Sequence, residues 1–240
     1  MLIKGLELDS EGFINVPKHI KKIRFDIGLS YCAPNSAVWL NDSDDVFVIG
    51  VEPNKFCVNS IKTNGLYCKQ KGVKLSYPND RFMLINCALD NVTDITEQMF
   101  YHMEGDPGTS SLLEPTDKLK YSVKEKSMVT TIPFSYLLSK IDFDRFEYIE
   151  LVKTDTQGKD LDIIKSVGPF LEKIAYLNSE VNTFEFYHDN NKPNDFNEFI
   201  LNNNFIKIND NSVVNGEVVD STYFNEKYKD IKGEINYFVL

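Results

Sequence analysis

Two acidic residues in the first quarter of the 240-residue sequence stand at the ends of apolar runs. Asp26 and Gly28 form an Asp-x-Gly turn after a run that begins at Ile23, and Glu52 closes the run Val46–Val51. The 26 positions from Asp26 to Glu52 fit one strand, a turn, a helix and a second strand. Both carboxylates are therefore expected at the carboxyl ends of neighbouring parallel strands, where open α/β sheets bind ligands.

The glycine pattern of this turn restricts the ligand. Dinucleotide sites use G-x-G-x-x-G, because a second glycine lets the backbone approach a pyrophosphate. Here Ser30 stands at that position, no glycine occurs between Gly28 and Gly50, and the sequence contains no G-x-x-x-x-G-K-[ST] phosphate loop. A nucleoside without phosphates fits better: with S-adenosylmethionine, the turn would hold the amino-acid end and Glu52 would accept the ribose hydroxyls. The alternative interpretation is an ordinary tight turn between a strand and a helix.

Composition and charge define the class of protein. A chain of this length with 42% hydrophobic residues is expected to form a single α/β domain with a full core. The net charge of −10, with lysine and arginine dispersed, predicts no nucleic-acid partner. The segment Leu2–Ile23 contains seven charged residues, so neither a signal peptide nor a membrane helix is expected, and the sequence predicts a cytoplasmic protein without a membrane partner. The four cysteines lack C-x-x-C spacing, which favours reduced thiols over a zinc site. No oligomeric state is predicted.

Strand and helix patterns alternate along the chain. Strands are expected at 23–27, 46–51, 82–89, 148–155, 174–181, 205–208 and 235–240, and helices at 34–40, 55–62, 132–141, 159–167 and around 196–201. This order predicts one Rossmann-like, doubly wound α/β domain over residues 1–240 with a seven-stranded mixed sheet. Residues 90–131 are less regular and predict a substrate-side insertion beside the ligand-binding edge.

Five short stretches share their order with the motifs of a known family: Asp26–Cys32, Glu52–Asn54, Asn86–Leu89, Gly108–Leu112 and Lys153–Leu161. The last one matches the pattern Lys-x-Asp-x-Gln/Glu-Gly-x-Glu/Asp-Leu. From about Ile23 to the C-terminus, the sequence resembles the FkbM-like family of S-adenosylmethionine-dependent methyltransferases. It departs from the family at Leu29-Ser30, which replaces Ala-Asn, at Cys32, which replaces the second glycine of the turn, and at Ser135, where the family often carries Asp.

The resemblance implies a role for each stretch. Contacts to the cofactor S-adenosylmethionine are expected from Asp26, Gly28, Ser30, Cys32, Glu52, Pro53, Cys87 and Ala88, and contacts to the substrate from Ser110 and Ser111. Asp155 is expected to accept the acceptor's proton, because the strand that it ends faces the methyl group in this architecture. Gln157 and Glu180 would orient the substrate, and His188 or His102 would be an alternative base.

Several of these residues also have other interpretations. Asp155 could cap the helix expected near Lys159, and Ser110-Ser111 could be a polar turn. Asp155, Glu180 and Asp106 could together hold Mg²⁺, but carboxylates on separate loops are a weak indication of a metal, and no metal site is predicted.

Methyl transfer from S-adenosylmethionine requires few catalytic groups from the protein. Methyl transfer from a sulfonium is an in-line displacement with an activated leaving group, so the protein mainly has to position the acceptor. The resemblance implies that the acceptor is a sugar hydroxyl of a glycan or small molecule. An amine, a lipid-linked precursor or a natural-product hydroxyl is the alternative acceptor, and a non-catalytic binding protein with the same fold is the alternative of a different class.

Overall fold

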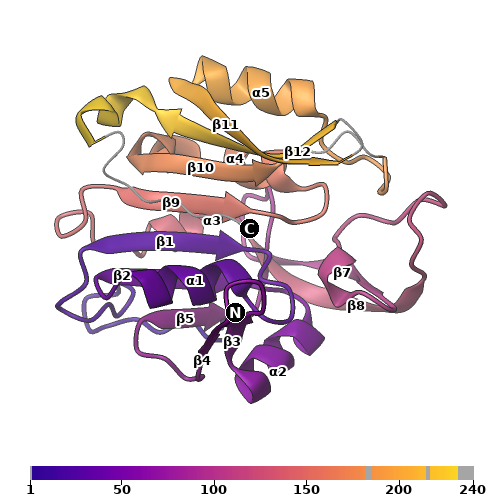
Figure 1. Ribbon diagram of the computed structural model, residues 1–240, viewed down its shortest axis with the longest axis horizontal. Helices are drawn as coiled ribbons and strands as arrows, with labels where there is room; N and C mark the ends of the chain where they lie inside the picture. Colours follow the sequence, from indigo (N-terminus) through magenta and orange to yellow (C-terminus); the bar gives the residue numbers. More distant parts are fainter. Residues whose placement is uncertain (1, 182–184, 215–216, 232–240) are drawn as a thin grey trace.

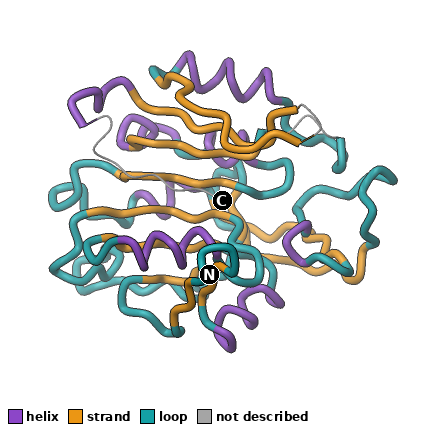
Figure 2. The backbone as a smooth tube through the Cα atoms, in the orientation of Figure 1, coloured by secondary structure: helices purple, strands orange, loops and turns teal. Residues whose placement is uncertain are grey.

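The computed structural model describes residues 2–181, 185–214 and 217–231, and its main feature is a seven-stranded mixed sheet (Figure 1 and Figure 2). From one edge to the other, the strands are β11 (Phe205–Val214), β12 (Glu217–Asn225), β10 (Ile174–Glu180), β9 (Ile149–Thr154), β1 (Lys22–Ile27), β2 (Val46–Val51) and β5 (Phe82–Ile85). The last five are parallel to one another, and β12 is antiparallel to both of its neighbours. The predicted α/β class with a seven-stranded mixed sheet is confirmed.

Helices cover both faces of this sheet, as the alternation of buried side chains along its strands requires. In β2, Val46 and Val48 belong to the core under α1 (Pro34–Asp42) and α2 (Lys55–Asn64). Phe47 and Ile49 belong to the core on the other face, together with side chains from α3 (Phe134–Leu138), α4 (Asp160–Lys165) and α5 (Pro193–Asn202). In Figure 1, α1 lies in front of the sheet and α3 and α4 lie behind it.

Local signals set the ends of the first two helices. Pro34 occupies the first position of α1, where a proline has no hydrogen bond to lose. Asn54 caps α2, because its side chain accepts the backbone N–H of Phe56, and Gly65 ends that helix at a positive φ of 79°. These caps fix where each helix starts after its strand, and so they position the loops at the carboxyl edge of the sheet.

The insertion predicted at 90–131 forms a second, small sheet. Its strands are β6 (Ala88–Leu89), β8 (Val123–Ile132) and β7 (Thr96–Met103), in that order, and the 3-10 helix η1 (Pro107–Thr109) lies in the connection between β7 and β8. Figure 1 shows the β7–β8 hairpin projecting beyond the arrowheads of β1 and β9. The insertion therefore lies at the carboxyl edge of the main sheet. A separate two-stranded sheet pairs β3 (Leu66–Cys68) with β4 (Val73–Leu75).

The strand predicted at 82–89 is in fact two strands, β5 and β6, in different sheets. The chain turns at Asn86, whose side-chain amide donates to the carbonyl oxygens of Glu52 at 2.9 Å and Pro53 at 3.2 Å. The strand predicted at 205–208 extends to Val214 as β11. The seventh strand of the sheet is β12, in a segment for which no strand was predicted, and the predicted strand 235–240 lies outside the described residues.

Two predicted helices are shorter than expected. In the segment 132–141, β8 continues to Ile132 and the helix covers only Phe134–Leu138, because the residue before Pro133 is restricted to extended conformations. The helix predicted at 159–167 is α4, over Asp160–Lys165, and the 3-10 helix η2 (Gly168–Lys173) follows it. A last 3-10 helix, η3 (Glu226–Ile231), follows β12. Among the described residues, no helix has both the length and the apolar character needed to cross a membrane.

Candidate functional site

A pocket of about 580 Å³ lies where β1, β2, β5 and β9 end beneath the insertion. Eight of the residues that the sequence singled out line it: Gly28, Ser30, Glu52, Pro53, Cys87, Ala88, Ser110 and Asp155. The apolar part of the wall adds Leu89, Phe100 and Leu112. The pocket therefore combines an apolar slot with two carboxylates at the sheet edge.

The glycine turn after β1 allows only glycine at its tightest point. Gly28 has a φ of +82°, and a Cβ atom there would lie 1.9 Å from the carbonyl oxygen of Asp155. Its backbone N–H donates to Val51 at 3.0 Å, and the N–H of Asp155 donates to Ile27 at 3.0 Å. The turn thus ties the ends of β1, β2 and β9 together. Ser30 follows in the left-handed region at φ 56°, a strained conformation that is concentrated at functional sites.

Glu52 places a buried carboxylate in the pocket. Its side chain accepts the backbone N–H of Asn54 at 2.8 Å and that of Ser30 at 3.1 Å. Burial raises the pKa of Glu52 from 4.5 to about 7, although these backbone donors favour the charged form. The backbone of Leu29 is a third donor to this carboxylate, and since a carboxylate has about four acceptor positions, Glu52 can still accept one hydroxyl group.

Asp26 lies behind the pocket rather than in its lining. Its Oδ2 accepts the backbone N–H of Ser36 at 3.1 Å and the hydroxyl of Ser36 at 2.6 Å, and its Oδ1 lies 3.7 Å from the ammonium of Lys153. Burial raises the pKa of Asp26 against the opposing effects of Lys153 and Ser36. Asp26 therefore anchors α1 and Lys153, and its contact to the cofactor stays a prediction.

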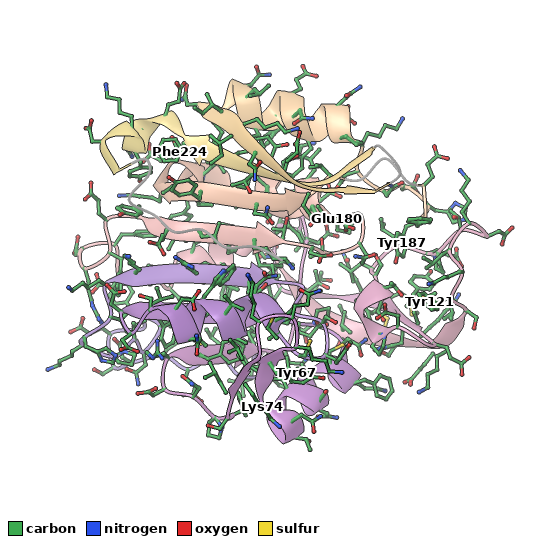
Figure 3. The ribbon with its side chains drawn as sticks, viewed as in Figure 1. Tyr67, Lys74, Tyr121, Glu180, Tyr187 and Phe224 are labelled. Atoms are coloured by element: carbon green, nitrogen blue, oxygen red, sulfur yellow. The ribbon has the colours of Figure 1, made fainter. Side chains whose placement is uncertain are left out.

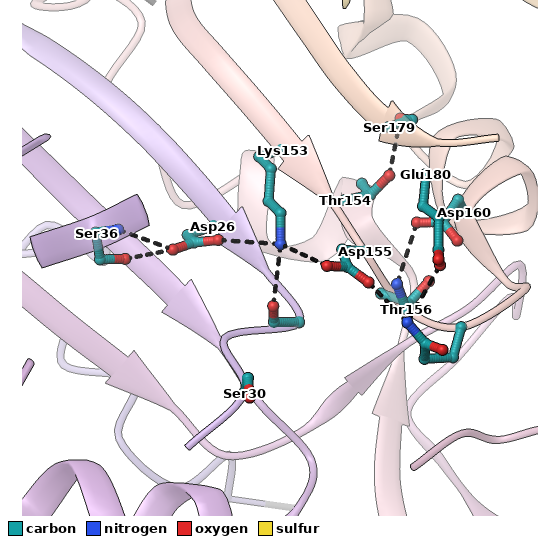
Figure 4. A network of polar contacts seen from close by, with 12 residues as sticks. Asp26, Ser30, Ser36, Lys153, Thr154, Asp155, Thr156, Asp160, Ser179 and Glu180 are labelled. Atoms are coloured by element: carbon teal, nitrogen blue, oxygen red, sulfur yellow. Dashed lines mark hydrogen bonds and ion pairs between the residues drawn. The ribbon is translucent and has the colours of Figure 1, made fainter. Parts of the chain in front are cut away.

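Lys153 connects Asp26 to the exposed end of the site (Figure 4). Its ammonium lies 3.3 Å from Oδ2 of Asp155 and donates to the carbonyl oxygen of Gly28 at 3.2 Å. Burial alone would lower the pKa of Lys153, but Asp155 and Asp26 outweigh it and the pKa is raised. The cation therefore joins the glycine turn to the end of β9.

Gln157 joins both carboxylates of the predicted catalytic set. Its amide nitrogen donates to Oδ1 of Asp155 at 2.9 Å and to Oε2 of Glu180 at 3.3 Å. Gln157 has a positive φ of 59°, which is uncommon for a residue other than glycine. Asp155, Gln157 and Glu180 are thus brought together as expected, and only Asp155 of the three lines the pocket. The capping interpretation of Asp155 is wrong, because the carboxylate at the start of α4 that binds a backbone N–H is Asp160, which accepts Thr156.

Neither histidine proposed as a base is placed at the pocket. His188 is exposed, and its backbone N–H donates to Glu114 at 2.9 Å. The preceding residue, Tyr187, faces the site instead: its hydroxyl donates to the carbonyl oxygen of Thr109 at 2.5 Å and lies 3.2 Å from Oε1 of Gln157. Figure 3 shows Tyr187 and Glu180 on the side of the molecule that carries the insertion.

His102 is buried inside the insertion. Its ring nitrogens lie 3.2 Å from Oδ1 of Asn54 and 2.7 Å from the hydroxyl of Ser127. Burial lowers the pKa of His102. The ring therefore supports the packing of β7 against the start of α2, away from Asp155.

The two serines predicted to bind substrate hold the segment around η1 in place. The Ser110 hydroxyl accepts the backbone N–H of Met103 at 3.1 Å and an amide N–H of Asn54 at 3.1 Å. The Ser111 hydroxyl donates to the carbonyl oxygen of Gln157 at 2.9 Å, and Ser111 does not line the pocket. Both serines thus connect η1 to the rest of the site, as the polar-turn interpretation expected.

Of the three departures from the FkbM-like pattern, Ser30 lines the pocket, whereas Cys32 and Ser135 do not. Cys32 is partly buried, and its carbonyl oxygen accepts the backbone N–H of Tyr67 at 2.9 Å. It does not line the pocket, and its contact to the cofactor stays a prediction. Burial raises the pKa of its thiol to about 11. Ser135 lies on α3, where its backbone N–H donates to Ser166. All four cysteines are free thiols, as predicted.

Three residues of the site were missed at the level of sequence. Lys153 belonged to the motif that pointed to Asp155, so its position two residues earlier on the same strand was an available signal. Lys159 lines the pocket and pairs with Asp90 at 2.9 Å and with Asp162 at 2.8 Å, which fixes the start of the insertion against α4. Tyr187 had no local signal.

Among the described residues, no group of three or more histidine, cysteine or carboxylate side chains is arranged to hold a metal ion. No protein-family model matches the sequence, and no curated protein matches it either. The functional assignment therefore depends on the residues of the pocket and on the motifs that point to them.

Proposed function

We propose that the protein is an S-adenosylmethionine-dependent methyltransferase that methylates a sugar hydroxyl of a glycan or small molecule. The observation that carries this proposal is the meeting of the Gly28 turn, the Glu52 carboxylate and the exposed Asp155 carboxylate around one pocket at the carboxyl edge of the parallel strands. That edge is where open α/β sheets bind their ligands.

The donor set fits this cofactor. Pro53, Ala88 and Phe100 offer an apolar slot for the adenine ring, and Glu52 has an acceptor position left for a ribose hydroxyl. The turn at Gly28 and Ser30 lies beside Asp155, which leaves the amino-acid end and the acceptor on the same side of the pocket. When bound, the cofactor supplies an activated methyl group on a sulfonium.

The chain's own residues then have to orient the acceptor and take up its proton. Asp155 is suited to this because its side chain is 40% exposed while Lys153 and Gln157 fix its two oxygens from behind and from the side. With the cofactor bound, its sulfonium would supply the methyl group and keep the electron pair of the broken carbon–sulfur bond, and Asp155 would accept the proton that the acceptor hydroxyl loses. Glu180 does not line the pocket but shares the Gln157 amide with Asp155, and in this proposal it accepts a second hydroxyl of the acceptor.

Calorimetry with S-adenosylhomocysteine tests the cofactor site. Binding is expected for the native protein, and Glu52→Gln should weaken it by about 1.5–3 kcal/mol, the range for hydrogen bonds to a charged group. Glu172→Gln is the matched control, because Glu172 is an exposed carboxylate in η2, at the opposite edge of the sheet. Absence of binding, or equal binding by both variants, contradicts the proposal. Methyl transfer to a panel of sugars, with the labelled cofactor, then tests the acceptor.

A further inference from the structure

A second hollow lies on the other side of η1 from the candidate site. This groove has a volume of about 880 Å³ and is lined by Tyr31, Phe56, Ser60, Asp106, Pro107 and Tyr121, with Gly105 beneath the Tyr121 ring. Pro107 lines both the groove and the pocket. The segment around η1 is therefore the wall between the two, and a ligand in the groove lies next to the proposed methyl-transfer site.

Aromatic rings form much of the groove surface. Tyr31 and Phe56 are 40% and 38% exposed, which is high for rings of this size on a protein with a well-filled core. Tyr121 packs over Gly105, where an added Cβ atom would lie 3.0 Å from the ring. Figure 3 shows Tyr121 at the insertion, on the same side of the molecule as Tyr187. Exposed rings that are held in place in this way offer flat apolar surface to a ligand.

The rim of the groove is basic, although the chain as a whole carries a net charge of −10. The ammonium of Lys124 lies 4.8 Å from the centre of the Phe56 ring, and that of Lys120 lies 4.7 Å from the centre of the Tyr121 ring. Within the described part of the chain, neither lysine forms an ion pair. Lys55, also beside Phe56, is paired with Glu125 at 2.6 Å. Lys120 also forms a hydrogen bond with the Tyr121 side chain, and the rim therefore carries two cations that lack an ion-pair partner among the described residues.

The groove also has acceptors for hydroxyl groups. Oδ1 of Asp106 accepts the backbone N–H of Gly108 at 3.0 Å, and the carboxylate retains acceptor capacity. The Ser60 hydroxyl lies on the same groove. Flat apolar surface, hydroxyl acceptors and cations at the rim together match a sugar ring that carries a negative charge. A nucleic acid is a poorer match, because a phosphate backbone is bound by a row of cations, and the rim offers Lys120 and Lys124.

We propose that this groove binds an acidic sugar residue of the glycan acceptor. The ring would pack against Tyr121 and Phe56, its hydroxyls would donate to Asp106 and Ser60, and its anionic group would lie between Lys120 and Lys124. That the bound sugar belongs to the methyl acceptor rests on the proposed function, whereas the binding of an acidic sugar in the groove does not. Binding can therefore be measured without any cofactor.

The test is titration of the full chain with trigalacturonate, maltotriose and uridine monophosphate, followed by calorimetry and by the amide NMR shifts of Gly105 and Asp106. Trigalacturonate should bind, maltotriose should bind more weakly, and added salt should weaken the binding of trigalacturonate, since charge attraction at a surface is screened. Lys124→Ala should weaken trigalacturonate binding by about threefold to fivefold, the upper range for an exposed ion pair, and Lys124→Arg should restore it.

Lys140→Ala is the matched control, because the ammonium of Lys140 also lies over an aromatic ring, 5.4 Å from the centre of Tyr136, and Tyr136 belongs to α3 at the other face of the sheet. Equal binding of maltotriose and trigalacturonate, tighter binding of uridine monophosphate, or equal loss in the Lys124 and Lys140 variants would overturn the proposal. S-adenosylhomocysteine binding on the same samples separates the two hypotheses: its absence with trigalacturonate binding intact rejects the methyltransferase and keeps the groove.

Discussion

The ammonium of Lys153 lies 3.3 Å from Oδ2 of Asp155, and the two side chains differ in exposure, 6% against 40%. A buried cation is thus paired with a carboxylate that reaches the pocket. The same ammonium lies 3.7 Å from the buried Asp26 and binds the carbonyl oxygen of Gly28. Lys153 is therefore the residue through which the core, the glycine turn and the proposed base are held in one arrangement.

Replacing Lys153 by methionine is expected to lower the free energy of unfolding by about 3–5 kcal/mol, because it leaves Asp26 buried without a counter-charge. Urea unfolding measures this change. Lys62→Met, at an exposed position of α2, is the control and should change stability by less than about 0.5 kcal/mol. Adding Asp26→Asn to Lys153→Met should recover part of the loss, since the two residues are coupled. Equal effects of the Lys153 and Lys62 variants would show that the cation does not hold the site together.

Local sequence patterns were sufficient to predict those strands that are apolar along their whole length. β1 and β2 were predicted nearly to the residue, because both faces of a parallel sheet are covered and the strands are buried along their length. β12 was missed because Asp220, Ser221 and Thr222 interrupt it with polar side chains. The neighbouring β10 satisfies this stretch, since the amide of Asn178 donates to the Thr222 hydroxyl at 3.0 Å. That pairing is between residues distant in sequence and leaves no local pattern.

The candidate site shows the same division. The residues in the pocket that follow directly from a strand end, Gly28, Glu52 and Asp155, were predicted from their spacing. Tyr187 was missed and His188 was chosen instead, because the bridge between Pro115 and Tyr187 decides which of the two side chains faces η1. The expected contact of Asp26 to the cofactor came from spacing, which gives the strand end but not the direction of the side chain, and Ser36 and Lys153 draw it away from the pocket.

The raised pKa of Glu52 predicts a specific pH dependence of stability. Between the unfolded value of 4.5 and the folded value of about 7, the folded protein holds a proton on Glu52 that the unfolded chain has lost. The contribution of Glu52 to the free energy of unfolding is therefore largest below pH 4.5. This contribution should fall by about 3 kcal/mol as the pH rises through 7.

Urea unfolding of the native protein and of Glu52→Gln across this pH range measures the Glu52 contribution. The variant should be less stable by an amount that does not depend on pH, because an amide nitrogen replaces an oxygen that accepts a backbone N–H. Its free energy of unfolding should lack the pH dependence that Glu52 causes. Asp160, whose burial also raises its pKa to about 7, remains in both proteins and cancels in the difference. Parallel curves would show that Glu52 does not titrate in this range.

Asp155→Asn separates catalysis from binding. The substitution keeps the shape of the side chain and removes its ability to accept a proton, so methyl transfer should slow by about 10²–10⁴-fold while S-adenosylhomocysteine affinity barely changes. Single-turnover rates and calorimetry measure the two effects. Loss of cofactor affinity with the fold intact would make Asp155 a cofactor ligand. The base would then be Glu180, the other carboxylate bound to Gln157.

Tyr187→Phe tests whether η1 has to be held against the site. The tyrosine hydroxyl donates to the carbonyl oxygen of Thr109 at 2.5 Å, next to the pocket residues Gly108 and Ser110. Without this bond, amide hydrogen exchange in the segment Thr109–Ser111 should accelerate, and S-adenosylhomocysteine affinity should fall by about 0.5–1.5 kcal/mol, the net value of one hydrogen bond. His188→Ala should change neither measurement, because His188 is exposed and only its backbone N–H is engaged. If His188→Ala lowers the affinity and Tyr187→Phe does not, the side chain that acts on the pocket is that of His188 and not that of Tyr187.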